Sequence, residues 1–224
     1  MNAIEVKNLC KIYNQNKPNE FCALKNINLS VKSGELVILK GVSGSGKSTL
    51  LGILGALSKP SSGEALINGR NVSKLPDIMS SNFRHSEVGF IFQSFNLLEG
   101  LSVYQNVLAP LSLTGLKKAK LNSQIERVLN LANIAHKKDQ IVSKLSGGEK
   151  QRCAIARALA MDPGIILADE PTANLDKQNS LIFIEMLQKF KELKKTVVVA
   201  THDILFDELG FVDGYIKMQN GEIS

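Results

Sequence analysis

The chain has 224 residues, of which 44% are hydrophobic, and a formal net charge of +6. This length and composition suffice to bury a core and favour one domain, or one domain with a lobe. The longest apolar runs, such as 35–40, 164–168 and 196–200, fall far short of the ~20 residues that a membrane span needs. We therefore expect a globular chain that does not cross a membrane.

The N-terminus has neither the basic start nor the apolar stretch of a signal peptide. The three cysteines, Cys10, Cys22 and Cys153, are odd in number and lack the spacing of metal ligands. We expect a reduced, cytosolic protein. The positive charge could indicate a nucleic acid or an anionic membrane surface. Because the lysines lie in short patches without interleaved aromatics, we favour solvated helix faces and expect no nucleic-acid partner.

The first strong pattern is an apolar strand, 35–40, followed by "GVSGSGKST" (41–49) and by apolar residues at helical spacing. Between a strand and a helix, this glycine pattern is typical of a phosphate-binding loop. Lys47 would supply a charge for the β- and γ-phosphates, and Ser48 a hydroxyl for Mg²⁺. The alternative is a glycine turn with a chance lysine. The candidate ATP-binding residues are Gly41, Ser43, Gly44, Ser45, Gly46, Lys47, Ser48 and Thr49.

After the probable strand 87–92 the pattern changes from strands to helices, with helical segments at 106–115 and 121–134 and a third that begins at "SGGEKQR". This indicates a helical lobe inserted in an α/β core, with Gln93 at the joint. Ser146, Gly147 and Gly148 begin the third helix and could offer backbone donors and a hydroxyl to an anion. By themselves they are equally a helix cap with turn glycines.

The segment "GIILADEP" places a nearly all-apolar run before Asp169 and Glu170. Such a run is typical of a buried parallel strand, and ligands bind at the carboxyl ends of these strands. Asp169 could hold hydrated Mg²⁺, and Glu170 could polarise the water that attacks the γ-phosphate. The alternative is that both acids cap a helix that begins near Pro171. A further strand, 196–200, places His202 at the same edge, either as a donor to the γ-phosphate or in a structural role.

Six motifs in order give the chain its family resemblance. "GVSGSGKST", Gln93, "LSGGE", "IILADE", "NLD" (174–176) and His202 resemble the Walker A, Q-loop, signature, Walker B, D-loop and H-loop of ABC transporter ATPases. The resemblance covers essentially the whole chain. It implies an α/β fold, a P-loop NTPase (RecA-like) core with an N-terminal antiparallel β-subdomain and an inserted α-helical subdomain. The core would comprise 1–92 and 163–224, and the helical subdomain 93–162.

The resemblance also implies roles for single residues. Tyr13, after the first probable strand, would stack on adenine, or else is a core aromatic at a strand end. Gln93 would sense Mg²⁺ and the attacking water, and Asp176 would act in the D-loop. The signature residues would face ATP held by a second copy in a head-to-tail dimer. The implied metal ligands are Ser48, Gln93 and Asp169, the catalytic residues Glu170, His202 and Gln93, and the signature residues Ser146, Gly147, Gly148 and Glu149.

Within the family, "GFIFQSFNLLEGLSVYQNV" and "ILADEPTANLD" are most similar to the lipoprotein-releasing and macrolide-efflux group, which also includes the cell-division ATPase. The departures are Glu149, where glutamine is common, and Ala173, where glycine is common. The resemblance implies ATP, Mg²⁺, a homodimer and an integral membrane permease, with the chain at the inner face of the membrane. The alternatives are a cell-division or other non-cargo complex and a non-transport ABC ATPase.

The segment 94–101 would face the membrane partner. It contains Phe95, Leu97 and Leu98, and contiguous exposed apolar residues mark interaction sites. The alternative is that these side chains fill the core of the helical lobe.

Overall fold

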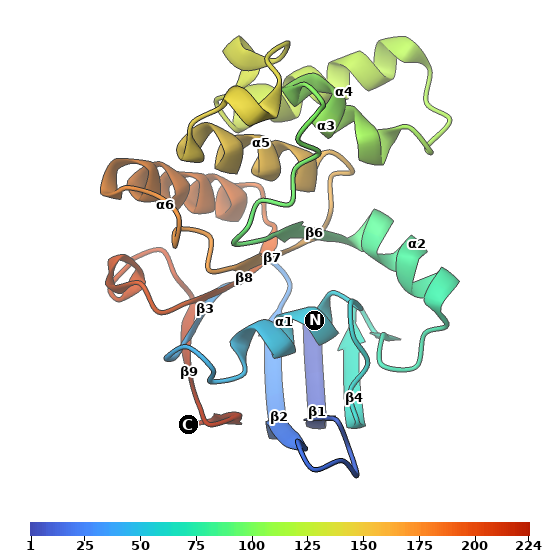
Figure 1. The fold of residues 1–224 in the computed structure, drawn as a ribbon, viewed down its shortest axis with the longest axis vertical. Helices are drawn as coiled ribbons and strands as arrows, with labels where there is room; N and C mark the ends of the chain where they lie inside the picture. Colours follow the sequence, from blue (N-terminus) through green and yellow to red (C-terminus); the bar gives the residue numbers. More distant parts are fainter.

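The computed structural model describes residues 1–224, which form two sheets flanked by helices (Figure 1). The strands are β1 (Asn2–Tyr13), β2 (Phe21–Lys32), β3 (Leu36–Lys40), β4 (Ser62–Ile67), β5 (Arg70–Asn71), β6 (Val88–Ile91), β7 (Ile165–Asp169), β8 (Thr196–Thr201), β9 (Gly214–Gln219) and β10 (Glu222–Ile223). The α-helices are α1 (Lys47–Leu54), α2 (Asp77–Glu87), α3 (Val103–Leu111), α4 (Lys118–Leu131), α5 (Gly147–Leu159) and α6 (Lys177–Glu192). Three short 3₁₀ turns are η1 (Ala135–Lys137), η2 (Val142–Lys144) and η3 (Ile204–Phe206).

The larger sheet has the strand order β10-β9-β3-β8-β7-β6, with parallel pairing from β9 to β6 and an antiparallel β10 at one edge. The smaller sheet, β2-β1-β4-β5, is antiparallel throughout. This confirms the expected α/β core with an N-terminal antiparallel subdomain. The parallel order brings the carboxyl ends of β3, β7 and β8 to one edge, where the glycine loop, the two acids and His202 follow.

The central strands are buried on both faces. In β3, Leu36 and Ile38 belong to one apolar cluster, whereas Val37 and Leu39 belong to the other. This alternation follows from the two-residue period of a strand. It explains why the central strands are continuous apolar runs in the sequence.

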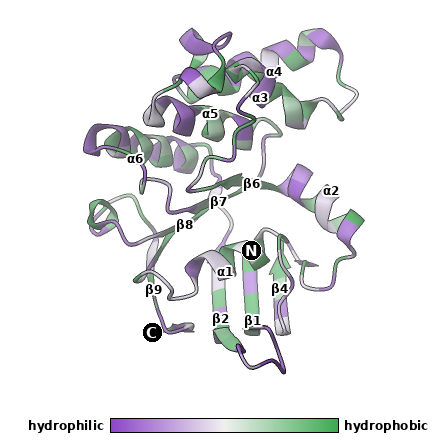
Figure 2. Cartoon of the chain, viewed as in Figure 1, coloured by the Kyte–Doolittle hydropathy of each residue, from purple (hydrophilic) through white to green (hydrophobic).

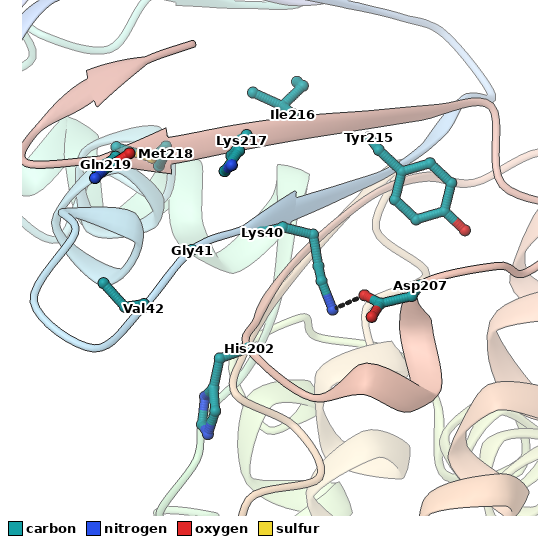
Figure 3. A pocket seen from close by; sticks show the side chains of 10 residues that line it. All are labelled: Lys40, Gly41, Val42, His202, Asp207, Tyr215, Ile216, Lys217, Met218 and Gln219. Carbon is teal, nitrogen blue, oxygen red and sulfur yellow. Dashed lines mark ion pairs between the residues drawn. The ribbon is translucent and has the colours of Figure 1, made fainter.

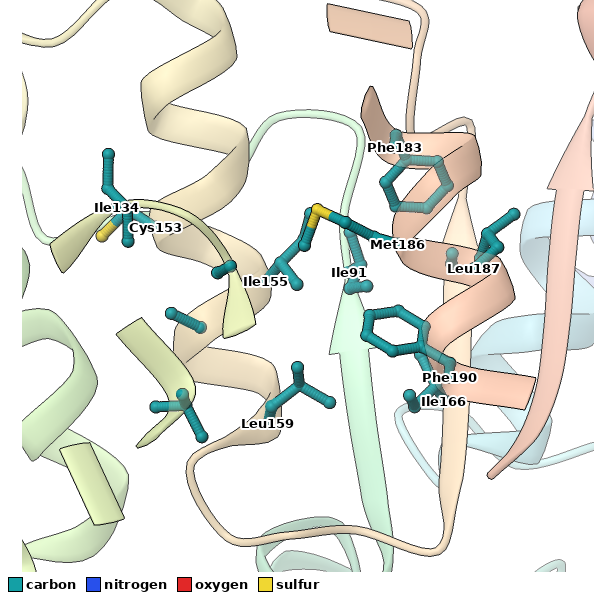
Figure 4. Close-up of a cluster of buried hydrophobic side chains, with 14 of the residues drawn as sticks. Ile91, Ile134, Cys153, Ile155, Leu159, Ile166, Phe183, Met186, Leu187 and Phe190 are labelled. Atoms are coloured by element: carbon teal, nitrogen blue, oxygen red, sulfur yellow. The ribbon is translucent and has the colours of Figure 1, made fainter. Parts of the chain in front are cut away.

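The first cluster continues from the sheet into the helical lobe. Its members include Ile166 of β7, Phe183 of α6 and Ile155 of α5 (Figure 4), and it extends to α3 and α4. Helix α5 lies between the sheet and the lobe. Figure 2 shows hydrophobic and hydrophilic residues alternating along α5 and α6, as expected for helices with one face against a core.

Some element boundaries differ from expectation. We expected Tyr13 to follow the first strand, but it is the last residue of β1. Helix α1 ends at Leu54, because Gly55 caps it and Ala56 takes a positive φ of 51°. No helix combines the length and hydrophobicity that a membrane crossing requires.

Candidate functional site

The glycine loop forms an anion cradle at the start of α1. Gly46 caps the helix with φ +104° and no side chain caps it, and the first turn holds no acidic residue. The loop lines a cavity of about 240 Å³ together with Phe21, Gln93 and Glu170. Exposed helix N-terminal donors are a site for phosphate. The N–H groups of the loop and the first turn of α1 that donate no hydrogen bond within the protein include those of Gly44, Gly46, Lys47, Ser48 and Thr49.

Two glycines let this loop pack against neighbouring strands. A Cβ on Gly41 would lie 2.3 Å from the Met218 carbonyl oxygen, and one on Gly46 would lie 2.7 Å from that of Ala23. Both distances are below any real Cβ contact. The loop therefore depends on glycine at these positions for its close approach to β9 and β2.

Lys47 lies inside the loop, with 4% of its side chain exposed. Its Nζ donates to the Gly41 and Val42 carbonyl oxygens at 2.6 and 3.1 Å and lies 3.4 Å from Glu170 Oε1. Its charge is thus held at the wall of the cavity, beside the free N–H groups, where a phosphate would be neutralised.

Ser48, which lines the cavity, is hydrogen-bonded to Asp169 of β7. The Ser48 hydroxyl donates to Asp169 Oδ1 at 2.9 Å. Burial, with the neighbouring Glu170 charge adding to it, raises the pKa of Asp169 above its ordinary value. Burial thus disfavours the charged Asp169 carboxylate unless a cation pairs with it. Hydroxyl and carboxylate oxygens are ligands that Mg²⁺ prefers, so these residues fit the metal. Gln93 lines the same cavity.

Glu170 lies between two partners. Its Oε2 is 3.0 Å from His202 Nδ1, while its Oε1 faces Lys47, and 12% of its side chain is exposed. The helix that follows, α6, begins only at Lys177 and is capped by Asp176. The alternative that Asp169 and Glu170 cap a helix is therefore wrong.

The second glycine turn begins α5 and lies outside this cavity. Ser146 caps the helix, and Ser146 and Glu149 form a reciprocal capping box. The Glu149 carboxylate also pairs with Lys137 at 3.2 Å. The Ser146 N–H lowers the pKa of Glu149. A Cβ on Gly148 would lie 2.0 Å from Asn179 Oδ1, so this glycine lets α5 approach α6. The helix cap foreseen for this turn is present, and Ser146 and Gly147 are exposed.

The chain matches a family model described as ABC transporter over residues 24–173, more than half of its length. The chain belongs to the ABC transporter family. It is 43% identical to the lipoprotein-releasing system ATP-binding protein LolD of Pseudoalteromonas translucida, over 98% of this chain and 97% of LolD. It is 42% identical to the macrolide export ATP-binding/permease protein MacB of Campylobacter jejuni, over 89% of this chain and 30% of MacB.

A solved ABC cassette has the same fold. It is described as a dimer in a post-hydrolysis state bound to ADP and Pi, and it superposes with a TM-score of 0.90 at 38% identity over 99% of this chain and 96% of that one. These similarities confirm the family expected from the six motifs. The chain is the ATP-binding, ATP-hydrolysing subunit of an ABC transporter.

An aromatic residue that the sequence analysis did not single out lines the cavity of this ABC ATPase. Phe21, the first residue of β2, lines the cavity with 57% of its surface exposed, whereas Tyr13 does not line it. The two are partners across β1 and β2, and Lys11 Nζ lies 5.0 Å from the Tyr13 ring centroid. The pairing register of β1 and β2 decides which aromatic side chain faces the loop. The sequence carries no local signal of this register, so it could not have singled out Phe21.

The segment after Gln93 is held by α5. Phe95 and Asn96 take positive φ values of 60° and 51°, and their carbonyl oxygens accept hydrogen bonds of 2.8 and 2.6 Å from Arg157. The expected apolar surface is wrong for Leu97, which packs against the core of the lobe. Leu98 is 48% exposed.

Proposed function

We propose that this ABC ATPase is the energy subunit of a complex for lipoprotein release or efflux, and that it acts on a separate integral membrane subunit at the cytoplasmic face. The observation that carries this proposal is the similarity to LolD over nearly the whole of both chains. MacB is an ATP-binding/permease protein of which this chain matches 30%.

We also propose a homodimer in which ATP lies between the phosphate loop of one copy and the signature of the other. Ser146 and Gly147 are exposed, and none of the signature residues lines the cavity of its own chain. A signature so placed can reach a γ-phosphate only on another copy. The dimeric cassette of the same fold supports this arrangement.

In the proposed reaction the protein supplies mainly position and charge. Lys47 and the free N–H groups of the loop bind the phosphates. Glu170 accepts the proton of the attacking water, and His202 donates a hydrogen bond to the γ-phosphate. Ser48, Asp169 and Gln93 would hold Mg²⁺, which would supply positive charge to neutralise the phosphates. Asp176 caps α6 and would act at the dimer interface.

The base of ATP would lie on the aromatic pair at the ends of β1 and β2. Phe21 is the nearer to the phosphate loop, since it lines the cavity, and Tyr13 is its cross-strand partner. Stacking needs only a π-face from the protein, which both rings provide.

We propose that the membrane subunit inserts a cytoplasmic segment between α2, β6 and α5. A groove of about 250 Å³ there is lined by apolar residues, including the stacked rings of Phe90 and Phe92, whose centroids are 4.2 Å apart. Arg84, His85 and Arg157 also line it and no carboxylate does, and the two arginines donate to backbone carbonyl oxygens. An apolar segment with an acidic residue fits this lining.

Adding one negative charge tests the groove. His85→Glu should abolish co-purification with the membrane subunit, because it places a carboxylate against the acidic residue we propose. The matched control is His136→Glu on the exposed η1 turn outside the groove, which should co-purify normally. Equal recovery with both variants would exclude this groove as the docking site.

Substitution of the two acids tests the catalytic roles. Glu170→Gln should keep ATP affinity and lower kcat by roughly 10²-fold or more, as loss of a general base does. Asp169→Asn should instead weaken binding of Mg²⁺-ATP. The measurements are nucleotide titration and steady-state ATPase assays with the membrane subunit present. A comparable loss of affinity in both variants would show that the roles are assigned wrongly.

A further inference from the structure

Lys40 is a half-buried cation that the proposed reaction does not use. It is the last residue of β3, directly before Gly41 of the phosphate loop, and it follows four buried apolar residues. Only 20% of its side chain is exposed. A charge so far removed from water is costly unless it is paired and hydrogen-bonded, which raises the question of what holds it there.

The lysine joins the phosphate loop to the segment that follows His202. Its Nζ donates to the Asp203 carbonyl oxygen at 2.7 Å and forms an ion pair with the Asp207 carboxylate (Figure 3). In the sheet Lys40 is paired with Thr201 of β8, which brings the two segments together. Lys40, His202 and Asp207 line one groove of about 650 Å³.

The imidazole of His202 has little support of its own. It is 60% exposed, and the hydrogen-bonding partner of its ring is Glu170. Its position therefore depends on the backbone around it. That backbone is fixed at Asp203, whose carboxylate accepts from Thr172 Oγ1 and the Leu205 N–H, and whose carbonyl oxygen accepts from Lys40.

We propose that Lys40 is a positioning residue for ATP hydrolysis. It acts through Asp203 and Asp207 and fixes the segment 203–207, and with it His202, relative to the phosphate loop. It touches neither nucleotide nor metal. The inference rests on the proposed role of His202. It means that β3 both leads into the phosphate loop and, through Lys40, fixes the segment after His202.

The test compares Lys40→Met with Lys40→Arg in the full-length protein bound to its membrane subunit. Methionine keeps the apolar stem and removes the charge. We expect kcat to fall about 10-fold with KM within about 2-fold, since small misplacements of a catalytic group cost up to ~10²-fold. Arginine keeps the charge and should recover most of the activity. Asp207→Asn should lower kcat in the same direction, so the inference is testable even if Lys40→Met does not fold.

A His202→Ala background separates this inference from the proposed function. There, Lys40→Met should cause no further loss, because residues that act as a unit are not additive. A full second loss, or an unchanged kcat in Lys40→Met and Asp207→Asn, would overturn the role of Lys40 while leaving that of His202 intact. Full activity of His202→Ala alone would instead overturn the proposed role of His202.

Discussion

Helices α1 and α5 both begin at a glycine-rich turn, but their N-termini differ in what satisfies the backbone. Helix α1 has Gly46 as its cap, no side-chain cap and no acid in its first turn. Helix α5 has Ser146 as its cap and Glu149 in its first turn, in a reciprocal capping box. The first N-terminus is left for a ligand, whereas the N–H groups of Ser146 and Glu149 at the second are satisfied by its own chain.

The difference has a thermodynamic meaning. A helix end without a cap is less stable by itself and gains from a bound anion, so the α1 turn couples nucleotide binding to its own order. The capped α5 turn is preformed and offers an exposed serine hydroxyl. In the proposed dimer, the two glycine turns would serve one reaction, the first as a binding site and the second as a preformed surface presented to a second copy.

The strongest test of this comparison mixes two inactive proteins. Lys47→Ala should abolish nucleotide binding, and Ser146→Arg should place a bulky cation at the γ-phosphate of the partner copy. Each homodimer should be inactive. Mixed in the presence of the membrane subunit, they should recover ATPase activity, because a heterodimer contains one intact site.

The control is Ser143→Arg, which adds the same charge at an exposed serine one turn earlier and should stay active. If the signature completed its own chain's site, no mixing ratio would restore turnover. If Ser146→Arg alone were active, the second glycine turn would have no role in ATP hydrolysis beyond capping α5.

A pair of glycine substitutions should break the first turn to different extents. Gly46→Ala brings a Cβ to 2.7 Å from a backbone oxygen at φ +104°, whereas Gly44→Ala enters open space at φ +79°. The left-handed backbone alone costs about 1–2 kcal/mol for alanine. We expect ATP affinity to fall about 10-fold for Gly44→Ala and by a further order of magnitude for Gly46→Ala. Equal affinities in a nucleotide titration would argue against the close packing of the loop on β2.

The smallest effect should come from the α5 cap. Glu149→Ala removes half of the capping box and should cost about 1 kcal/mol, or a Tm lower by about 2–4 °C. Glu149→Gln keeps a hydrogen bond to the Ser146 N–H but removes the charge, so at neutral pH it should melt between the alanine variant and the unmodified protein. Because the folded-state pKa of Glu149 is lowered, its charge stabilises the fold above the ordinary carboxyl pKa. This contribution is lost as the pH falls through the lowered pKa. A difference between the glutamine and native proteins that persists in acid would contradict this.

Local patterns predicted the parts of the site that depend on local sequence. The strand, glycine loop and α1 could be read from residues 35–57 because each step follows from its neighbours. The carboxylates were placed by the apolar run of β7. In contrast, Phe21 at the cavity depends on the register of β1 and β2, and the Lys40–Asp207 pair joins residues far apart in the chain. Leu97 could not be assigned because a loop residue can turn to either side.

The hydrogen bonds from Arg157 couple the segment after Gln93 to one end of α5, whose other end carries Ser146. Arg157 lies eleven residues from Ser146, or about 16 Å along the helix at 1.5 Å per residue. A rotation of ~10° about the Arg157 end would displace Ser146 by about 3 Å, which is the length of a hydrogen bond. A partner that moves the backbone at Phe95 and so rotates α5 by a small angle can therefore make or break a hydrogen bond of the Ser146 hydroxyl at the other end of the helix.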